Sequence, residues 1–315
     1  MLGVRRESSD NLCGACAPAQ VRKPAGTAAP GWDHDRMPLV IDATDDPRTA
    51  FARCRSFLEA RPVEHNVALS ILHERIAAPL AGRYWWALEH GEVTGYAFCS
   101  PLGFYAGLSL MAPTTVVALA EQMAADAPEL AGVTGEAGVA ATFAGRWTEL
   151  LATGAAPAEG QRTYRLDAVT PADPPPGSMR PATGADRAMI LRWMAGYFDD
   201  VGAGHAAVEV EDMVDRRIGD GWIWLWDDGG PAAMTTSIAP VAGAVRIGFV
   251  YTPPERRRHG YAQALVAQLS QQALDRGADV CLLYTQLHNP SSNAIYRRVG
   301  YRAVGEGTRY RFLTT

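Results

Sequence analysis

The chain has 315 residues, enough for two ordinary domains of roughly 150 residues each. Hydrophobic residues make up 48% of it and charged residues 20%, a balance that allows substantial buried cores. With a net charge of −5, the chain shows neither the basic surface of a nucleic-acid-binding protein nor a polybasic membrane anchor. We therefore expect neither nucleic acid nor a membrane as a partner.

Residues 1–36 form a tail rich in Pro, Ala and Gly without apolar periodicity, and we expect it to be disordered. The tail lacks the apolar core of a secretory signal, which favours a cytoplasmic protein. Cys13 and Cys16 have the spacing of a redox or zinc pair, but no second cysteine pair and no strand–helix context accompany them. Met37 is an alternative start of the protein, because the first strand-like run follows it directly.

Residues 37–169 form the first predicted domain. Two helical runs are expected after Pro47, followed by an aromatic hairpin that turns at Gly91. No charged residue occurs from Val93 to Ala120, a length that raises the question of a membrane helix. The Gly and Pro residues within that stretch favour strands and turns instead.

A Pro-rich linker at 170–177 separates this domain from a second one at 178–315. The two halves repeat each other, since Trp86 recurs as Trp224 and Gly91 as Gly229, each 138 residues later. Two helical runs also precede the hairpin in the second half, the first beginning at a capping-box pattern after Thr183. We infer a tandem duplication.

The second half alternates strands and helices, which predicts a mixed α/β sheet with helices on both faces. The expected helices are 185–198, 207–218, 260–275 and 290–298. The expected strands are 178–182, 221–227, 231–239, 244–251, 279–285, 301–304 and 308–313.

The most informative segment joins the strand at 244–251 to the helix from 260. Pro253 and Pro254 stop the strand, and Arg256, Arg257 and Arg258 precede Gly260 at the start of the helix. The first turn of a helix has unpaired N–H groups and a partial positive charge, and glycine lets the backbone approach a ligand closely. The joint therefore predicts an anion site, with a solvated basic turn as the alternative.

Residues 257–262 resemble the Arg/Gln-x-x-Gly-x-Gly/Ala signature of the GNAT N-acetyltransferase superfamily, and residues 289–301 resemble its later Asn–Tyr helix. The resemblance implies tandem GNAT-like domains, each with a splayed mixed sheet. It also implies acetyl-CoA as co-substrate, bound between the splayed strands without a metal. The residues implied to bind acetyl-CoA are Val250, Tyr251, Thr252, Arg257, Arg258, His259, Gly260, Tyr261, Ala262 and Asn293, with Asn289 as an alternative that could instead only begin a turn.

The reaction implied by the resemblance is direct transfer of an acetyl group to a primary amine of a small molecule or peptide. Tyr296 matches the family's general acid, which protonates the leaving thiolate. The general base stays open, because many relatives carry a Glu on the strand at 247–251 and this chain has none. The candidates are water, His288, Asp199, Asp200, Glu209 and Glu211.

The first half lacks a matching phosphate loop, since the equivalent stretch at 110–120 has neither Arg nor Gly. We expect it to be a degenerate domain that packs against the second or walls the acceptor site. Its strand aromatics are either core or pocket lining: Tyr84, Trp85, Trp86, Tyr96 and Phe98. The alternative to an enzyme is a non-catalytic acyl-CoA sensor or partner-binding module. The sequence leaves open the acceptor and the choice between monomer and homodimer.

Overall fold

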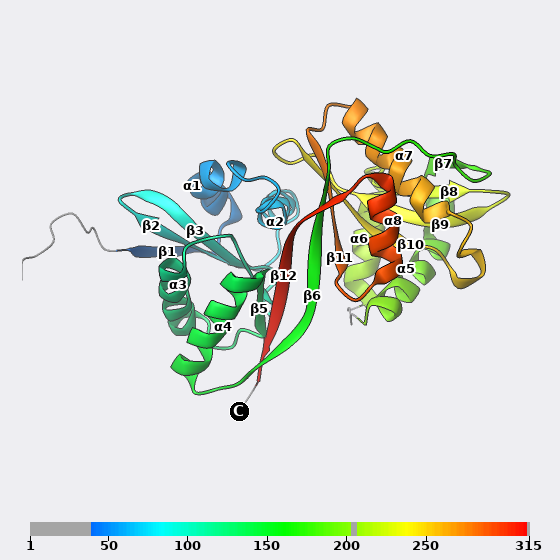
Figure 1. The fold of residues 1–315 in the computed structure, drawn as a ribbon. Helices are drawn as coiled ribbons and strands as arrows, with labels where there is room; N and C mark the ends of the chain where they lie inside the picture. Colours follow the sequence, from blue (N-terminus) through cyan, green and yellow to red (C-terminus); the bar gives the residue numbers. More distant parts are fainter. Residues whose placement is uncertain (1–38, 203–206, 314–315) are drawn as a thin grey trace, which may run out of the picture. The chain divides into compact units, whose positions relative to one another are not determined.

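The computed structural model describes residues 39–202 and 207–313 (Figure 1). The tail at 1–36, the cysteine pair in it and Met37 lie outside the described residues.

The first half begins with a strand and two helices. Asp46 caps the first helix, since its carboxylate accepts hydrogen bonds from the backbone N–H groups of Arg48 and Thr49, and Pro47 stands at the first helical position. In chain order the elements are β1 Val40–Thr44, α1 Pro47–Glu59, α2 Asn66–Ala77, β2 Arg83–Glu89, β3 Glu92–Cys99, β4 Ala106–Leu108, α3 Pro113–Asp126, β5 Gly132–Glu136, α4 Ala137–Leu151 and β6 Ala155–Leu166.

The second half repeats this order of strands and helices, which confirms the predicted tandem arrangement. Its elements are β7 Ser178–Pro181, α5 Arg187–Val201, α6 Ala207–Gly219, β8 Ile223–Asp227, β9 Pro231–Ser237, β10 Ala244–Tyr251, α7 Tyr261–Asp275, β11 Val280–Gln286, α8 Pro290–Val299 and β12 Arg302–Phe312. Short 3-10 turns at Gly184–Asp186 and Pro254–Arg256 precede α5 and α7.

All the strands join one mixed sheet in the order β1-β2-β3-β4-β5-β12-β6-β11-β10-β9-β8-β7. The expectation of two final strands is wrong, because β12 runs unbroken from Arg302 to Phe312. Its glycines mark register shifts and not a turn. A Cβ on Gly307 would lie 2.9 Å from the carbonyl oxygen of Gly135 on β5, so this glycine permits close approach of the backbones.

The two halves exchange their last strands. β6, from the first half, pairs with β11 of the second half, while β12, from the second half, pairs with β5 of the first (Figure 1). Phe312 at the end of β12 stacks on Trp147 of α4, with ring centroids 4.8 Å apart. Tyr164 of β6 is buried in the core of the second half. The segment at 170–177 contains no helix or strand, but the sheet is not divided there.

Each half has helices and a hydrophobic core on both faces of its sheet. In the second half, α7 and α8 pack on one face, and α5 and α6 pack on the other. In the first half, α3 and α4 cover one face, and α1 and α2 the other. The five strand aromatics of the first half are all buried in these two cores. No helix among the described residues is long and apolar enough to cross a membrane.

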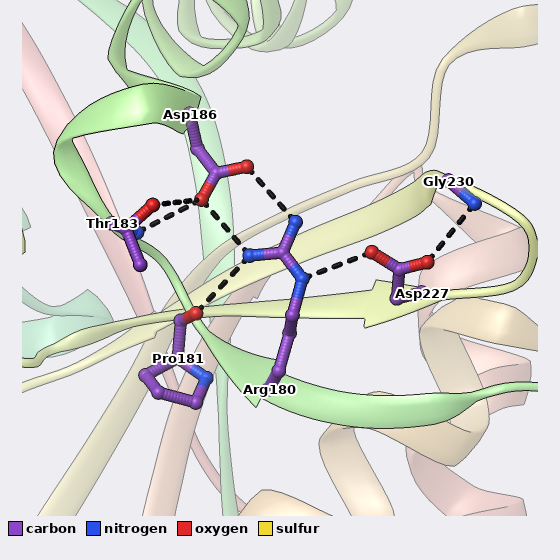
Figure 2. A network of polar contacts seen from close by, with 6 residues as sticks. All are labelled: Arg180, Pro181, Thr183, Asp186, Asp227 and Gly230. Atoms are coloured by element: carbon purple, nitrogen blue, oxygen red, sulfur yellow. Dashed lines mark hydrogen bonds and ion pairs between the residues drawn. The ribbon is translucent and has the colours of Figure 1, made fainter.

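A polar network fixes the start of α5, the helix that borders the candidate site (Figure 2). The Arg180 guanidinium makes two 2.9 Å hydrogen bonds to the Asp186 carboxylate and a third, also 2.9 Å, to Asp227. Asp186 accepts from the backbone N–H of Thr183, which completes the predicted capping box. The bond from Arg180 lowers the pKa of Asp186 to about 2.

Candidate active site

β10 and β11 separate along their length and open a fork in the sheet. Their parallel pairing covers only Ala244–Arg246 of β10, opposite Val280–Leu282 of β11. Beyond that point β10 stays paired with β9 on its other side. The free edges of β10 and β11 therefore expose backbone groups to any chain-like ligand that enters between them.

A β-bulge sits on the free part of β10. Its register against β9 shifts between Gly248 and Tyr251, and Phe249 has a φ of 48°. A bulky residue at positive φ is costly, and it persists only where the surrounding structure holds it. The aromatic side chains of Tyr197 and Phe198 on α5 provide that packing, with ring centroids 5.3 and 6.0 Å from Phe249. The bulge turns the backbone of Phe249 and Val250 out of the regular ladder.

The loop after β10 delivers an uncapped helix N-terminus to the same place. Gly260 is the N-cap of α7, with a φ of 84°, and no side chain caps the helix. Arg258 is also at positive φ, 69°. The first-turn N–H groups of α7 are therefore left without a side-chain acceptor. A Cβ on Gly260 would lie 3.9 Å from Pro175 of the linker, so the linker passes beside this loop.

Two arginines of the loop differ in their contacts. Arg257 donates to the carbonyl oxygen of Thr252 at 2.9 Å and to the Asp200 carboxylate at 2.6 Å. These bonds hold the loop closed on β10 and α5. Arg258 is exposed, and within the part of the chain that the structure describes its side chain has no hydrogen-bond or ion-pair partner. Arg258 is therefore available to an anion.

The remaining loop residues support the helix start. The His259 ring stacks on Tyr261 at 5.5 Å, and its Nδ1 lies 2.8 Å from the carbonyl oxygen of Arg257. Tyr261 donates from its hydroxyl to Asp228 at 2.6 Å. Ala262 lies in the first turn of α7, where its small side chain leaves the backbone accessible.

Two asparagines border the opposite arm of the fork. Asn289 caps α8, accepting a 2.9 Å bond from the N–H of Ser292, which is the turn-forming role left open by the sequence. Asn293 is buried, and its amide donates to the carbonyl oxygens of Gln286 and Asn289. Its Oδ1 accepts a 2.8 Å bond from the Tyr164 hydroxyl. Both amide protons are used inside the protein, so its contact with acetyl-CoA stays a prediction.

Tyr296 is buried on α8 between two other tyrosines, with ring centroids 6.1 Å from Tyr164 and 6.2 Å from Tyr301. Burial raises the pKa of its hydroxyl well above the ordinary value, and Tyr197 raises that pKa further. A free tyrosine and a free thiol have similar pKa values, which favours proton transfer between them. The raised pKa of Tyr296 removes that similarity with a free thiol. A thiolate that forms in equally dry surroundings also has a raised pKa, so proton transfer between the two stays feasible.

The candidate general bases differ in their ion pairs and in their exposure to solvent. Asp200 is paired with Arg257, and Glu211 lies 3.1 Å from Arg187. Asp199 and His288 are exposed. The side chain of Glu209 lies outside the described residues. Among the described residues, no group of three or more His, Cys, Asp or Glu side chains is placed to hold a metal ion.

Two residues of this site were not predicted. Tyr164 belongs to the first half in sequence, and only the strand exchange brings it to Asn293. Phe249 looks like an ordinary strand aromatic, and nothing in its neighbours signals the bulge.

Residues 228–311 match a family model described as FR47-like protein. The structure resembles a GCN5-related N-acetyltransferase from Sphaerobacter thermophilus, at 18% identity over 87% of this chain and 95% of that one, with a TM-score of 0.60. The fold is that of the GNAT superfamily.

Further GNAT structures match over the same share of the chain. An acetyltransferase from Colwellia psychrerythraea is 10% identical over 87% of this chain and 100% of that one, with a TM-score of 0.56. A tandem GNAT protein from the clavulanic acid biosynthesis pathway is 14% identical over 87% of this chain and 98% of that one, with a TM-score of 0.55. No curated protein sequence matches significantly.

Proposed function

We propose that this protein is an N-acetyltransferase that moves an acetyl group from acetyl-CoA to a primary amine, with its active site in the second half. One observation carries the proposal: the bulge of β10 lies at the fork between β10 and β11, and the loop after β10 leads directly to the uncapped N-terminus of α7. A phosphate cradle and a strand-like slot thus lie side by side, as an anionic, amide-containing thioester requires.

The residues have distinct roles in this proposal. The backbone of the α7 first turn and Arg258 bind the pyrophosphate of acetyl-CoA, while Arg257 keeps the loop in place. The main chain of Val250, Tyr251 and Thr252 lies along the fork, where it can pair with the amides of the pantetheine arm. Backbone N–H groups near the bulge stabilise the negative charge that develops on the thioester oxygen.

The transfer conserves all atoms. The amine nitrogen forms a bond to the acetyl carbon, the bond from that carbon to sulfur breaks, and the electron pair leaves with sulfur. Tyr296 gives its proton to the thiolate, the nitrogen loses a proton to water, and a proton returns from water to Tyr296, which restores the enzyme. Water is the base in this proposal because Asp200 and Glu211 are committed to ion pairs.

The test is thiol release from acetyl-CoA over a panel of primary amines. We expect turnover with at least one amine, and Tyr296→Phe should lower kcat by about 10–100-fold while leaving the Kd for acetyl-CoA unchanged. Tyr301→Phe is the matched control, since Tyr301 is equally buried but bonds Ser270 at 2.8 Å, away from the fork. Tight acetyl-CoA binding without transfer to any amine would favour a sensor.

A further inference from the structure

Two arginines, Arg246 of β10 and Arg217 of α6, lie near the closed end of the fork on the face of the sheet that α5 and α6 cover. Arg246 is the only charged residue of β10, and it stands at the last position where β10 pairs with β11. Arg217 extends from α6 to the same face, donating from Nη1 to Thr236 Oγ1 at 3.0 Å. Thr236 is the β9 partner of Gly248, two residues beyond Arg246 on β10, so all these side chains share one face.

Arg217 also touches the bulge. Its guanidinium carbon lies 5.2 Å from the centre of the Phe249 ring, and the Thr236 hydroxyl bonded to it is 3.2 Å from the Gly248 carbonyl oxygen. Only one of the donors of Arg217 has an acceptor within the described residues. The others remain available beside the backbone where the proposed function places the thioester.

Neither arginine has a carboxylate of its own. Of the side chains that the structure describes, none with negative charge lies within ion-pairing distance of Arg217 or Arg246. The nearest acidic influence is Glu74 of α2, which is already paired with Arg216 at 2.8 Å and with Arg75 at 3.4 Å. Arg216 and Arg75 thus occupy the carboxylate of Glu74, and the positive charges of Arg217 and Arg246 are left unbalanced within the described residues.

Such a pair is costly in the absence of an anion. Burial lowers the pKa of Arg217 to about 10, and the charge of Arg246 lowers it further. Burial also lowers the pKa of Arg246, while Tyr284 and Glu74 oppose that change. Guanidinium groups bind carboxylates with two parallel hydrogen bonds, and an anion between them would relieve both desolvation and mutual repulsion.

We propose that Arg217 and Arg246 bind a carboxylate of the acceptor, and that the acceptor is therefore an amino acid whose carboxylate lies close to the amine that is acetylated. Arg217 lies beside the bulge, where the proposed function places the thioester. A carboxylate bound to Arg217 is therefore joined by only a short link to the amine that attacks the thioester. The inference rests on the proposed function, since it assigns a substrate class to the same active site.

The test compares acceptors that differ only in the carboxylate. Thiol release from acetyl-CoA is measured for the common amino acids and for their α-carboxamides. We expect kcat/KM to be about 10–100-fold higher for the preferred acid than for its amide, the effect of a charge-assisted hydrogen-bond pair. Arg217→Met and Arg246→Met should each reduce that ratio about tenfold or more, and Arg217→Lys should restore part of it.

Arg216→Met is the control, because Arg216 is the next residue on α6 but pairs with Glu74. For Arg216→Met, the ratio of kcat/KM for the acid to kcat/KM for its amide should equal that of the wild type. Each variant is first checked for an unchanged Kd for acetyl-CoA, which shows that the fork is folded. Active protein with equal kcat/KM for acids and amides would overturn the carboxylate site and leave the transferase standing.

Transfer to no amine at all would instead count against the proposed function. In that case the arginine pair is tested by binding alone, as the rise in Tm caused by N-acetylglycine compared with N-acetylglycinamide. A larger rise with the acid that disappears in Arg217→Met supports the anion site. Equal rises with acid and amide, or a rise unaffected by Arg217→Met, overturn it.

Discussion

The two halves of this chain share one order of elements, but only the second has a long loop with arginines and a glycine before the helix that follows its fourth strand. In the second half, the eight-residue β10 carries a bulge and leads through the loop at 252–260 to α7, whose N-cap is Gly260. In the first half, β4 has three residues, and only residues 109–112 separate it from α3. α3 begins with Pro113, and the connection before it contains neither Arg nor Gly.

This comparison shows how local the difference is. The two helical layers and the hairpin are alike, while the second half differs by a longer strand, a bulge on that strand and a glycine-containing loop after it. In the first half, Met111 of the short connection before α3 packs closely against β3. A Cβ on Gly95 of that strand would lie 2.9 Å from the Met111 sulfur. The first half nevertheless supplies β6, and with it Tyr164, to the candidate site in the other half.

The largest expected effect comes from separating the halves. A fragment of residues 170–315 loses β6, which pairs with Cys281–Gln286 of β11 and contributes Tyr164 and Leu166 to the core of the second half. We expect this fragment to be unfolded and unable to bind acetyl-CoA, as measured by circular dichroism and calorimetry. Deleting residues 1–37, which precede β1, is the control and should leave Tm nearly unchanged. A folded fragment that binds acetyl-CoA would refute the dependence on strand exchange.

The next effect concerns the loop that only the second half has. Gly260→Val places a branched side chain at a φ of 84° beside the first turn of α7, and we expect acetyl-CoA affinity to fall about 100-fold or more. Gly103→Val is a matched control in the first half, with a φ of 88° and open space around its Cβ. Gly103→Val should lower the free energy of unfolding by a similar amount without weakening the binding of acetyl-CoA. Equal affinity losses in both variants would remove the special role of the loop.

A smaller effect tests the bond between the halves at the site. Tyr164→Phe leaves the buried Oδ1 of Asn293 without its 2.8 Å donor and should lower the free energy of unfolding by about 2 kcal/mol. Tyr84→Phe is the control in the first half, because the buried Tyr84 hydroxyl has no partner. Its removal should be nearly neutral or stabilising. Urea denaturation of both variants decides whether the two buried hydroxyls differ in this way.

The smallest effect concerns the network at the start of α5. The folded-state pKa of Asp186 is about 2, below its ordinary 3.8, so its contribution to stability is present above about pH 4 and disappears as the pH falls through 2. Asp186→Asn should cost about 1 kcal/mol at neutral pH, and the difference from wild type should shrink below pH 4. A difference that stays constant from pH 7 to pH 2 would contradict the charge-based explanation.

Local patterns predicted much of the fold. The capping box at Thr183 and the strand over 244–251 were predicted correctly, because both depend on residues that are neighbours in sequence. The helix after Gly260 was predicted correctly to within one residue for the same reason. The last strand was not, since its glycines look like a turn until β5 and β6 are placed on either side of it.

The sequence by itself determined the repeat, the alternation of strands and helices, and the basic loop before α7, since each depends on short-range periodicity or composition. Only the tertiary structure decided which strands complete which half, because β6 and β12 pair with partners far away in the chain. It also decided that Arg217 lies beside the bulge, on the same face of the sheet as Arg246. This placement depends on how α6 packs over β9 and β10, which no local pattern specifies.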